Sequence, residues 1–157
     1  MRLLALTLGA ALMALAPGAS QHQTHRQSSL MGFDQVATTH HFYLSESGGS
    51  IDVSVNDPAD ATNLAGIRHH LEMLPLTFKT GDFSTPKAVH EGTVVAGADS
   101  LRRLQDRVEY HYQETQRGGR VDIMATNREA LAAVHAFLRF QITDHQTGDA
   151  LEVTTRP

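Results

Sequence analysis

The chain has 157 residues, with 13 lysines and arginines against 17 acidic residues, 10 histidines and no cysteine. A net negative charge without a basic stripe argues against nucleic acid as a partner, because nothing would neutralise the phosphates. The lack of cysteine excludes a thiol nucleophile and a thiolate metal site, which leaves histidine, aspartate, glutamate and methionine as candidate metal ligands. The histidines are the one anomaly in the composition.

Residues 1–20 predict a secretory signal peptide. They open with a single positive residue, Arg2, continue with the apolar run LLALTLGAALMALA and end in the small residues of PGAS. This order is typical of signal peptides that are removed on export, and the apolar run is too short to span a bilayer comfortably. We therefore expect a periplasmic or secreted bacterial protein without stable membrane insertion.

The first half of the remaining chain predicts two strands and a helix. After a polar, aperiodic segment at 21–37, which we expect to be a flexible tail, the runs HHFYL and SIDVSV flank the glycines of SESGG, as in a β-hairpin. The stretch NDPADATNLAGIRHHLEMLPLTF has apolar residues every three or four positions. It predicts a helix that is capped by Asn56 or Asp57, kinked or shortened at Pro75 and ended by Gly81.

The second half repeats the first. VEYHYQE and GRVDIMAT flank the glycines of TQRGG, and NREALAAVHAFLRFQITDH predicts a second helix before a second TGD. Hairpin positions match at an offset of 70, as for Gly48 and Gly118, and helix positions match at an offset of 67, as for Leu71 and Leu138. Between the halves, we expect STPKAVHEGTVVAG to be irregular and ADSLRRLQD to be a short helix. The pattern indicates an internal duplication.

The duplication predicts an α+β fold. Residues 38–150 are expected to form one domain of two ββα repeats, 38–82 and 108–149, followed by a C-terminal tail at 151–157. Two such units most simply form a four-stranded antiparallel sheet with two helices on one face, a permuted ferredoxin-like arrangement, plus the short extra helix. The other face of the sheet is left open.

Strand alternation assigns the strand histidines to the two faces of the sheet. His40 is expected to point inward like its repeat counterpart Tyr110, whereas His41 points outward. The same alternation places two related His and Asp pairs on the open face: His41, His111, Asp52 and Asp122. Such pairs either orient metal-bound imidazoles or simply solvate an exposed face.

The remaining histidines lie on helices and in one loop. His70 and His135 flank the buried stripes of their helices and His69 points to solvent, so a hydrogen-bonded structural role is the simpler account for each. His145 ends the second helix, where the helix dipole favours a cation. His90 lies in the longest irregular connection, and ligand-binding residues are often found in such loops.

Five segments carry a resemblance to a known group of proteins: TTHHFYL, IRHHL, GDFSTPKAVH, RGGRVDI and AVHAFLRFQITDHQTGD. Together they resemble an uncharacterised family of small exported bacterial proteins with the pattern TTHHF, IR-x-HL, GDF-x-x-P followed by a histidine, and FL-x-FQI-x-DH-x-TGD. The resemblance extends from Gly32 to Asp149. It selects these histidines: His40, His41, His70, His90, His135 and His145. Because the family supplies no established activity, the resemblance implies residues and no reaction.

A histidine excess without cysteine in an exported chain favours a non-catalytic module that binds or handles copper or zinc. The expected ligands are His41, His70 and His90, followed by His40 and His145. The residues expected to orient them, or to form a separate site, are His111, His135, Asp52 and Asp122. Two alternatives stay open: a structural or interaction protein that forms a homodimer or binds a partner through the open sheet face, and an enzyme that uses His and Asp as acid and base. Without a phosphate loop or a dinucleotide fingerprint, we expect no nucleotide cofactor.

Overall fold

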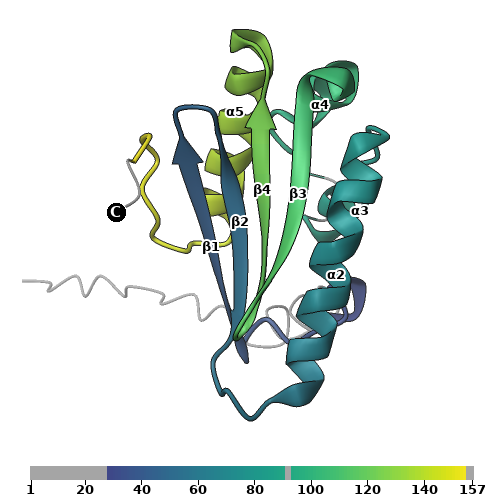
Figure 1. Ribbon diagram of the computed structural model, residues 1–157, viewed down its shortest axis with the longest axis vertical. Coiled ribbons are helices and arrows are strands. Elements are labelled where there is room, and N and C mark those ends of the chain that lie inside the picture. The colour runs from purple at the N-terminus through teal and green to yellow at the C-terminus, as the bar shows by residue number, and fades with distance from the viewer. Residues whose placement is uncertain (1–27, 91–92, 155–157) are drawn as a thin grey trace, which may run out of the picture.

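The computed structural model describes residues 28–90 and 93–154 and shows a two-layer α+β fold (Figure 1). The strands are β1 (Thr38–Ser45), β2 (Gly48–Val55), β3 (Val108–Thr115) and β4 (Gly118–Ala125), and the helices are α2 (Ala61–Lys79), α3 (Ser84–Val89), α4 (Ala98–Arg103) and α5 (Arg128–Asp144), with a 3-10 turn at Gln105–Arg107. The predicted signal peptide, 1–20, and residues 21–27 of the predicted tail lie outside the described residues. No helix within the described ranges is long and apolar enough to cross a membrane.

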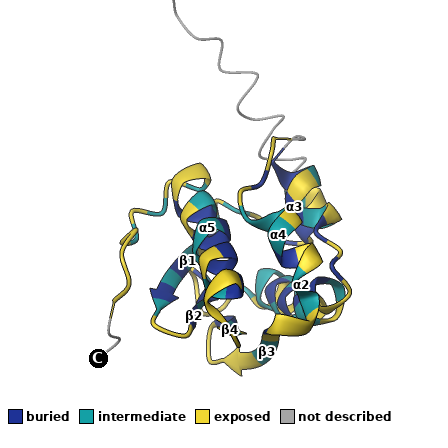
Figure 2. Ribbon diagram, turned by 90° about the horizontal axis from the view of Figure 1, so that it is seen from above, coloured by how far each residue is buried: buried dark blue, intermediate teal, exposed yellow. Residues whose placement is uncertain are grey.

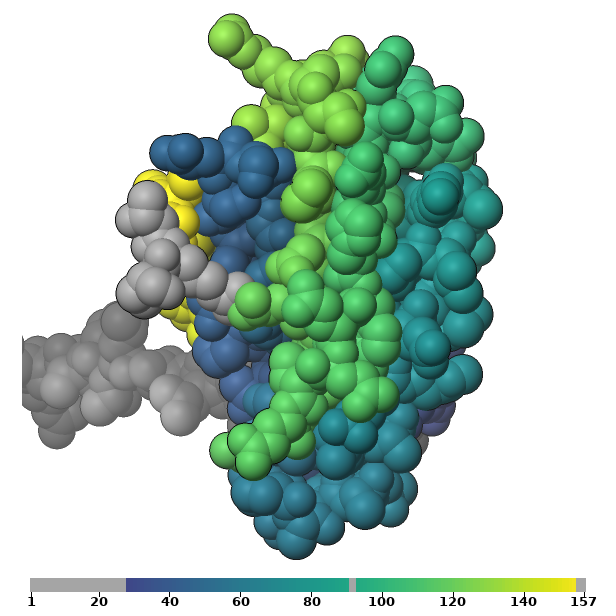
Figure 3. Space-filling model, in the orientation of Figure 1, coloured from purple at the N-terminus to yellow at the C-terminus, as the bar shows by residue number. Residues whose placement is uncertain are grey.

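The four strands form one antiparallel sheet in the order β1-β2-β4-β3, which is the order that a permuted ferredoxin-like fold of two ββα units requires. Both hairpins close in the same register, since Ser45 pairs with Gly48 and Thr115 with Gly118. Figure 2 shows α2, α4 and α5 on one side of the sheet. Figure 3 looks onto the opposite, open side, where the two hairpins lie next to each other. The predicted fold class is confirmed.

The core fills the space between the sheet and the two long helices. Alternate strand residues and one stripe of each helix are buried, including Val53, Val55, Val121, Ile123, Ile67, Leu71, Val134 and Leu138. Two strand glycines let the helices come close: a Cβ built on Gly49 would lie 2.3 Å from Leu138 Cδ1, and one on Gly119 would lie 3.1 Å from Leu71 Cδ1. The duplicated glycines therefore set the distance between the layers.

Each long helix packs mainly on the hairpin of the other repeat. α2 lies against β3 and β4, and α5 lies against β1 and β2. Arg68 of α2 donates to two carbonyls at the β3–β4 turn, at 3.1 and 3.4 Å, and His135 of α5 donates to the equivalent carbonyls at the β1–β2 turn, at 2.9 and 3.1 Å. His135 is thus a structural histidine, and each repeat holds the turn of the other.

The first long helix differs from its predicted limits. It begins after Asp60, whose carboxylate accepts the Asn63 amide hydrogen at 3.0 Å, and the predicted cap Asp57 instead closes the preceding turn by accepting the Ala59 amide hydrogen at 2.9 Å. The helix continues through Pro75 to its last residue, Lys79, so the proline does not shorten it. The second helix follows its prediction more closely, with Asn127 as the N-cap.

Two segments expected to be irregular are ordered against the core. Residues 28–31 form a helical turn within the predicted tail, and Met31 and Phe33 are only 7% and 4% exposed. The connection after α2 contains α3, where Pro86 lies in the first helical turn and so removes no backbone hydrogen bond. Two apolar side chains in a polar segment have no period, which is why sequence patterning overlooked them.

The open face of the sheet carries the predicted outward residues, but their side chains pair differently. Strand register puts His41 opposite Asp52 and His111 opposite Asp122. Arg120 holds Asp52 in a forked ion pair at 2.7 Å, and Asp122 accepts a hydrogen bond from a glutamine of β3 at 2.8 Å. The two histidines have other carboxylate partners: His41 donates to Asp149 at 2.8 Å, and His111 lies 3.5 Å from Glu109.

Candidate functional site

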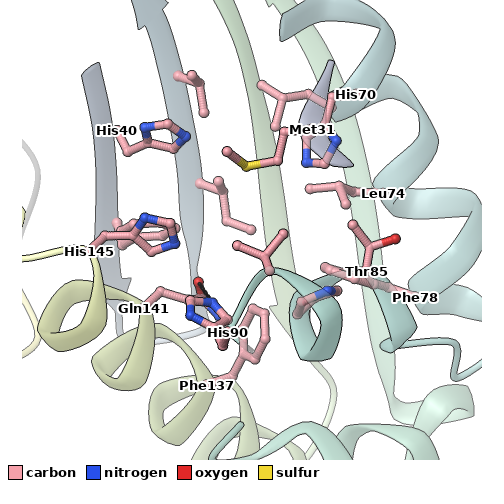
Figure 4. Close-up of a pocket in the computed structure, with 16 residues that line it drawn as sticks. Met31, His40, His70, Leu74, Phe78, Thr85, His90, Phe137, Gln141 and His145 are labelled. Carbon is pink, nitrogen blue, oxygen red and sulfur yellow. Dashed lines mark hydrogen bonds between the residues drawn. The ribbon is translucent and has the colours of Figure 1, made fainter. Parts of the chain in front are cut away.

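A small cavity between the sheet and the helices is lined by four of the histidines (Figure 4). His40 comes from β1, His70 from α2, His90 from the end of α3 and His145 from the end of α5. The cavity has a volume of about 60 Å³, and the rest of its lining is almost entirely apolar, with neither a carboxylate nor a lysine or arginine among the lining residues described. Polar imidazoles in such surroundings call for an explanation.

The local structure of each element explains why its histidine lies at the cavity. His40 alternates with the buried Phe42 on the inner face of β1. His70 flanks the buried stripe of α2, one turn after Ile67. His145 is the C-cap of α5, and the chain beyond it is tied to β1 by Asp149, which accepts the backbone amide hydrogen of Phe42 at 2.9 Å. These ties hold the imidazole of His145 beside that of His40.

The imidazole rings form a contiguous group with a few aromatic neighbours. The ring centroids of His40 and His145 are 5.4 Å apart and nearly parallel, and those of His90 and His145 are 5.1 Å apart and perpendicular. Phe33 bridges the remaining gap, because its ring centroid is 5.6 Å from those of both His40 and His70. The cluster therefore reaches from β1 across to α2.

His90 differs from the other three in its hydrogen bonding. Its Nδ1 lies 2.5 Å from the Asp144 carboxylate and its Nε2 lies 3.1 Å from the side-chain oxygen of Gln141. The ring is almost fully buried, at 5% exposure. With both nitrogens engaged, His90 fastens the end of α3 to α5 and leaves Gln141 with a buried side-chain nitrogen that has no partner among the described residues.

The ring nitrogens of His40, His70 and His145 have no hydrogen-bond partner within 28–90 and 93–154. Burial lowers the pKa of His40 to about 3, helped by the neighbouring imidazole of His145. Burial also lowers the pKa of His70 to about 4, with a contribution from His69, and that of His145 to about 4, with a contribution from His90 that outweighs the opposing effect of Asp144. All three imidazoles are neutral at pH 7, so each keeps a free lone pair.

The cavity has a neighbouring hollow at the protein surface. This outer hollow has a volume of about 230 Å³ and is lined by polar residues including Thr38, Thr39 and Thr147. His40 and His145 line both the inner cavity and the outer hollow. These two imidazoles therefore stand between solvent and the cavity.

The structure gathers only part of the predicted ligand set. His70, His90, His40 and His145 meet at the cavity, whereas His41 lies outside it and donates to Asp149 at 2.8 Å. The other predicted site residues, His111, Asp52, Asp122 and His135, also lie away from the cavity. The expectation that the helix dipole explains a charged His145 is wrong, because burial outweighs the dipole and keeps the ring neutral.

Two further cavity residues were not singled out from the sequence. Met31 fell in the predicted tail, and Gln141 has no chemical motif around it. The repeat offsets do carry a signal for the histidines: His40, His70 and His145 correspond to Tyr110, Phe137 and Phe78. Since those three aromatic positions are plainly core positions, the alignment of the repeats indicates that the histidines lie inside.

Comparisons with models of protein families, with curated proteins and with solved structures give no match. Among the described residues, no three histidine, aspartate or glutamate side chains already stand in a metal-binding arrangement. Any ion held in the cavity therefore requires the imidazoles to rotate toward it.

Proposed function

We propose that the protein is an exported module that binds one transition-metal ion, copper or zinc, in this cavity through His40, His70 and His145. One observation carries the proposal: three partly buried, neutral imidazoles line one cavity, and no hydrogen bond within the described residues engages their ring nitrogens. Ring nitrogens without a protein partner are available to water or to a metal ion. Imidazole lone pairs are suited to copper and zinc.

The spacing of the rings supports a shared ion. A metal lies about 2.0 Å from each imidazole nitrogen, so two imidazoles on one tetrahedral ion have ring centroids about 5 Å apart. His40 and His145 have a centroid separation of 5.4 Å. A shared ion requires the imidazoles of His40 and His145 to rotate until a nitrogen of each faces it, and we propose His70 of α2 as the third ligand.

The outer hollow gives the ion a route to the cavity. His40 and His145 line both spaces, and His41 also lines the outer hollow, so an ion arriving from solvent meets these three imidazoles first. His70 lies deeper, on α2. A site with an entry path and no carboxylate, lysine or arginine among its described lining residues is suited to taking up and holding an ion.

The acid–base alternative receives no support from the same residues. A general base works best with a pKa near the working pH, and the pKa values of His40, His70 and His145 are lowered to about 3 or 4. His90 and Asp144 do form a pair, but both nitrogens of His90 are engaged and the ring is buried. We therefore favour metal binding over catalysis.

Metal titration of the mature chain tests the proposal. Copper and zinc should each be titrated into wild-type protein and into His70→Phe and His145→Phe variants, which carry the residues that the other repeat has at these positions. Wild type is expected to bind close to one ion, and each variant to bind about 100-fold more weakly or worse, because losing a ligand costs more than the 10- to 100-fold contributed by outer partners.

The controls are His69→Phe and His111→Phe, which change exposed histidines. His22 and His25 are present in every variant, so their contribution cancels. A second signature is pH: because the cavity imidazoles have no protons to displace, affinity should change little between pH 7 and pH 5.5. Equal binding by all variants, or affinity that falls steeply over this range, would overturn the proposal.

A further inference from the structure

We infer that Met31 supplies a thioether ligand to the same ion and that the site is therefore selective for Cu(I). This inference rests on the proposed function and adds to it the identity and oxidation state of the ion. The methionine is buried, at 7% exposure, and lines the cavity. Figure 4 draws its side chain between His40 and His70, with the sulfur end in the cavity.

The backbone around Met31 holds the sulfur in place. Gly32 follows it with a φ of +79°, and the Gly32 carbonyl packs directly on α2, where a Cβ on Gly66 would lie only 2.2 Å from that oxygen. This contact places Gly32, the residue after Met31, beside Gly66, one turn of helix before His70. Two residues after Met31, the ring of Phe33 makes a tilted contact with that of His40 and an edge-on contact with that of His70. The segment is thus fixed on both sides of the proposed ligands.

The sulfur itself has little else to bind. The Gln35 side-chain nitrogen donates to it at a long 3.8 Å. A thioether sulfur has a second lone pair, and the cavity is the space into which it opens. Like the three imidazoles, Met31 therefore places a donor atom with an available lone pair at the cavity wall.

The charge of the cavity favours a monovalent ion. The described lining residues include no aspartate, glutamate or thiolate, and the nearby Asp144 is engaged with His90. The cost of transferring an ion into apolar surroundings grows with the square of its charge, so a divalent ion pays about four times the penalty of a monovalent one here. Neutral imidazoles with a thioether form a soft ligand set, which selects Cu(I).

The test compares two ions in one pair of variants. Under anaerobic reducing conditions, Cu(I) affinity is measured by competition with a chromophoric Cu(I) chelator, and Zn(II) affinity with a chromophoric zinc chelator. Met31→Leu, which keeps the volume of the side chain, is expected to weaken Cu(I) binding at least tenfold and to change Zn(II) binding less than threefold. Met124→Leu, on the outer face and 44% exposed, should change neither.

X-ray absorption at the copper edge adds a readout that a merely structural methionine would not move. Wild type should show one sulfur neighbour at about 2.3 Å, and Met31→Leu should show none. If wild type binds Cu(I), the histidine variants lose it and Met31→Leu keeps both affinity and spectrum, then this inference fails and the proposed function stands. If wild type binds neither ion, both fail together.

Discussion

Two equivalent sets of repeat positions are used in opposite ways. His40, His70 and His145, here called the histidine half, surround a cavity. The positions that the repeat offsets relate to them, here called the aromatic half, hold Tyr110, Phe137 and Phe78. The ring centroid of Phe78 lies 5.6 Å from that of Tyr110 and 5.8 Å from that of Phe137, in edge-to-face contact. The aromatic set packs ring against ring, with Phe78 and Phe137 also in the cavity wall and with the Tyr110 hydroxyl buried without a partner among the described residues. The histidine set presents imidazole lone pairs to the same small space.

The comparison shows that the histidines occupy core positions. Their counterparts Phe78 and Phe137 are 1% and 2% exposed, so large apolar side chains stabilise the fold at these positions. Imidazoles placed at such positions lose part of their hydration, and their ring nitrogens gain no hydrogen-bond partner among the described residues. A protein that keeps them gives up stability in one half of its core, which is the expected cost of a binding site built on rigid elements.

The largest expected effect is a loss of stability in acid that originates in the histidine half alone. The unfolded imidazoles bind protons below their ordinary pKa of 6.5, while the folded ones stay neutral down to about pH 4 or 3. Stability is therefore full above pH 6.5 and falls as the pH drops through this window. Between pH 7 and pH 5, each of the three histidines should lower the free energy of unfolding by about 2 kcal/mol.

Urea unfolding of metal-free protein at pH 7 and pH 5 measures this effect. Replacing His70 and His145 together by phenylalanine should remove about two thirds of the loss, whereas His69→Phe should leave it unchanged. The aromatic half should not titrate in this pH range, because its one ionisable group is Tyr110 and burial raises the pKa of that phenol. A loss between pH 7 and pH 5 that survives the double substitution would break the comparison.

Truncation should separate the two clusters next. Phe78→Ala removes a ring that contacts Phe83, Tyr110 and Phe137, and should lower the free energy of unfolding by about 3 to 5 kcal/mol. His145→Ala should lower it by less than about 1.5 kcal/mol at pH 7, because the imidazole lies beside existing space and its nitrogens have no partner to lose. Equal losses in urea unfolding would mean that the histidine cluster is packed as a normal core.

The strand glycines offer a test of the layer spacing. An alanine Cβ at Gly49 would lie 2.1 Å from the Tyr43 carbonyl oxygen, which is backbone and cannot easily move, whereas at Gly119 the nearest atom is the side-chain Cε2 of Tyr112, at 2.8 Å. Gly49→Ala should therefore destabilise by about 1 to 3 kcal/mol, and Gly119→Ala by less. Thermal unfolding of the two variants gives the order, and a larger loss for Gly119→Ala would contradict it.

The smallest expected effect is a gain in stability. His145→Phe gives the histidine half the residue that its counterpart position has, and replaces two unpartnered nitrogens by apolar ring atoms. At pH 7 and without metal, the free energy of unfolding should rise by about 1 kcal/mol, while the affinity for copper or zinc falls. His111→Phe is the matched control on the open face, and a stable variant that still binds metal tightly would argue against His145 as a ligand.

Sequence patterning predicted the elements that depend on local periodicity and glycine turns. The hairpins, the long helices and the fold class follow from the duplicated pattern, and the inward position of His40 follows from Tyr110. The cavity did not follow, because it depends on which elements meet across the sheet. Three further facts depend on tertiary contacts and could not be predicted from the sequence pattern. The Met31 segment folds back onto α2, Arg120 forms an ion pair with Asp52, and burial outweighs the helix dipole at His145.

The crossed packing of the helices has a consequence for how such a site can arise. Each helix covers the hairpin of the other repeat and holds its turn, through Arg68 in one case and His135 in the other. A single ββα unit therefore lacks the partner that closes its core. Two identical units in separate chains would place the same three side chains on both sides of their symmetry axis, giving two histidine sets or two aromatic sets. Joining the units in one chain lets their sequences differ. One set of positions can then form a binding site while the other stabilises the fold.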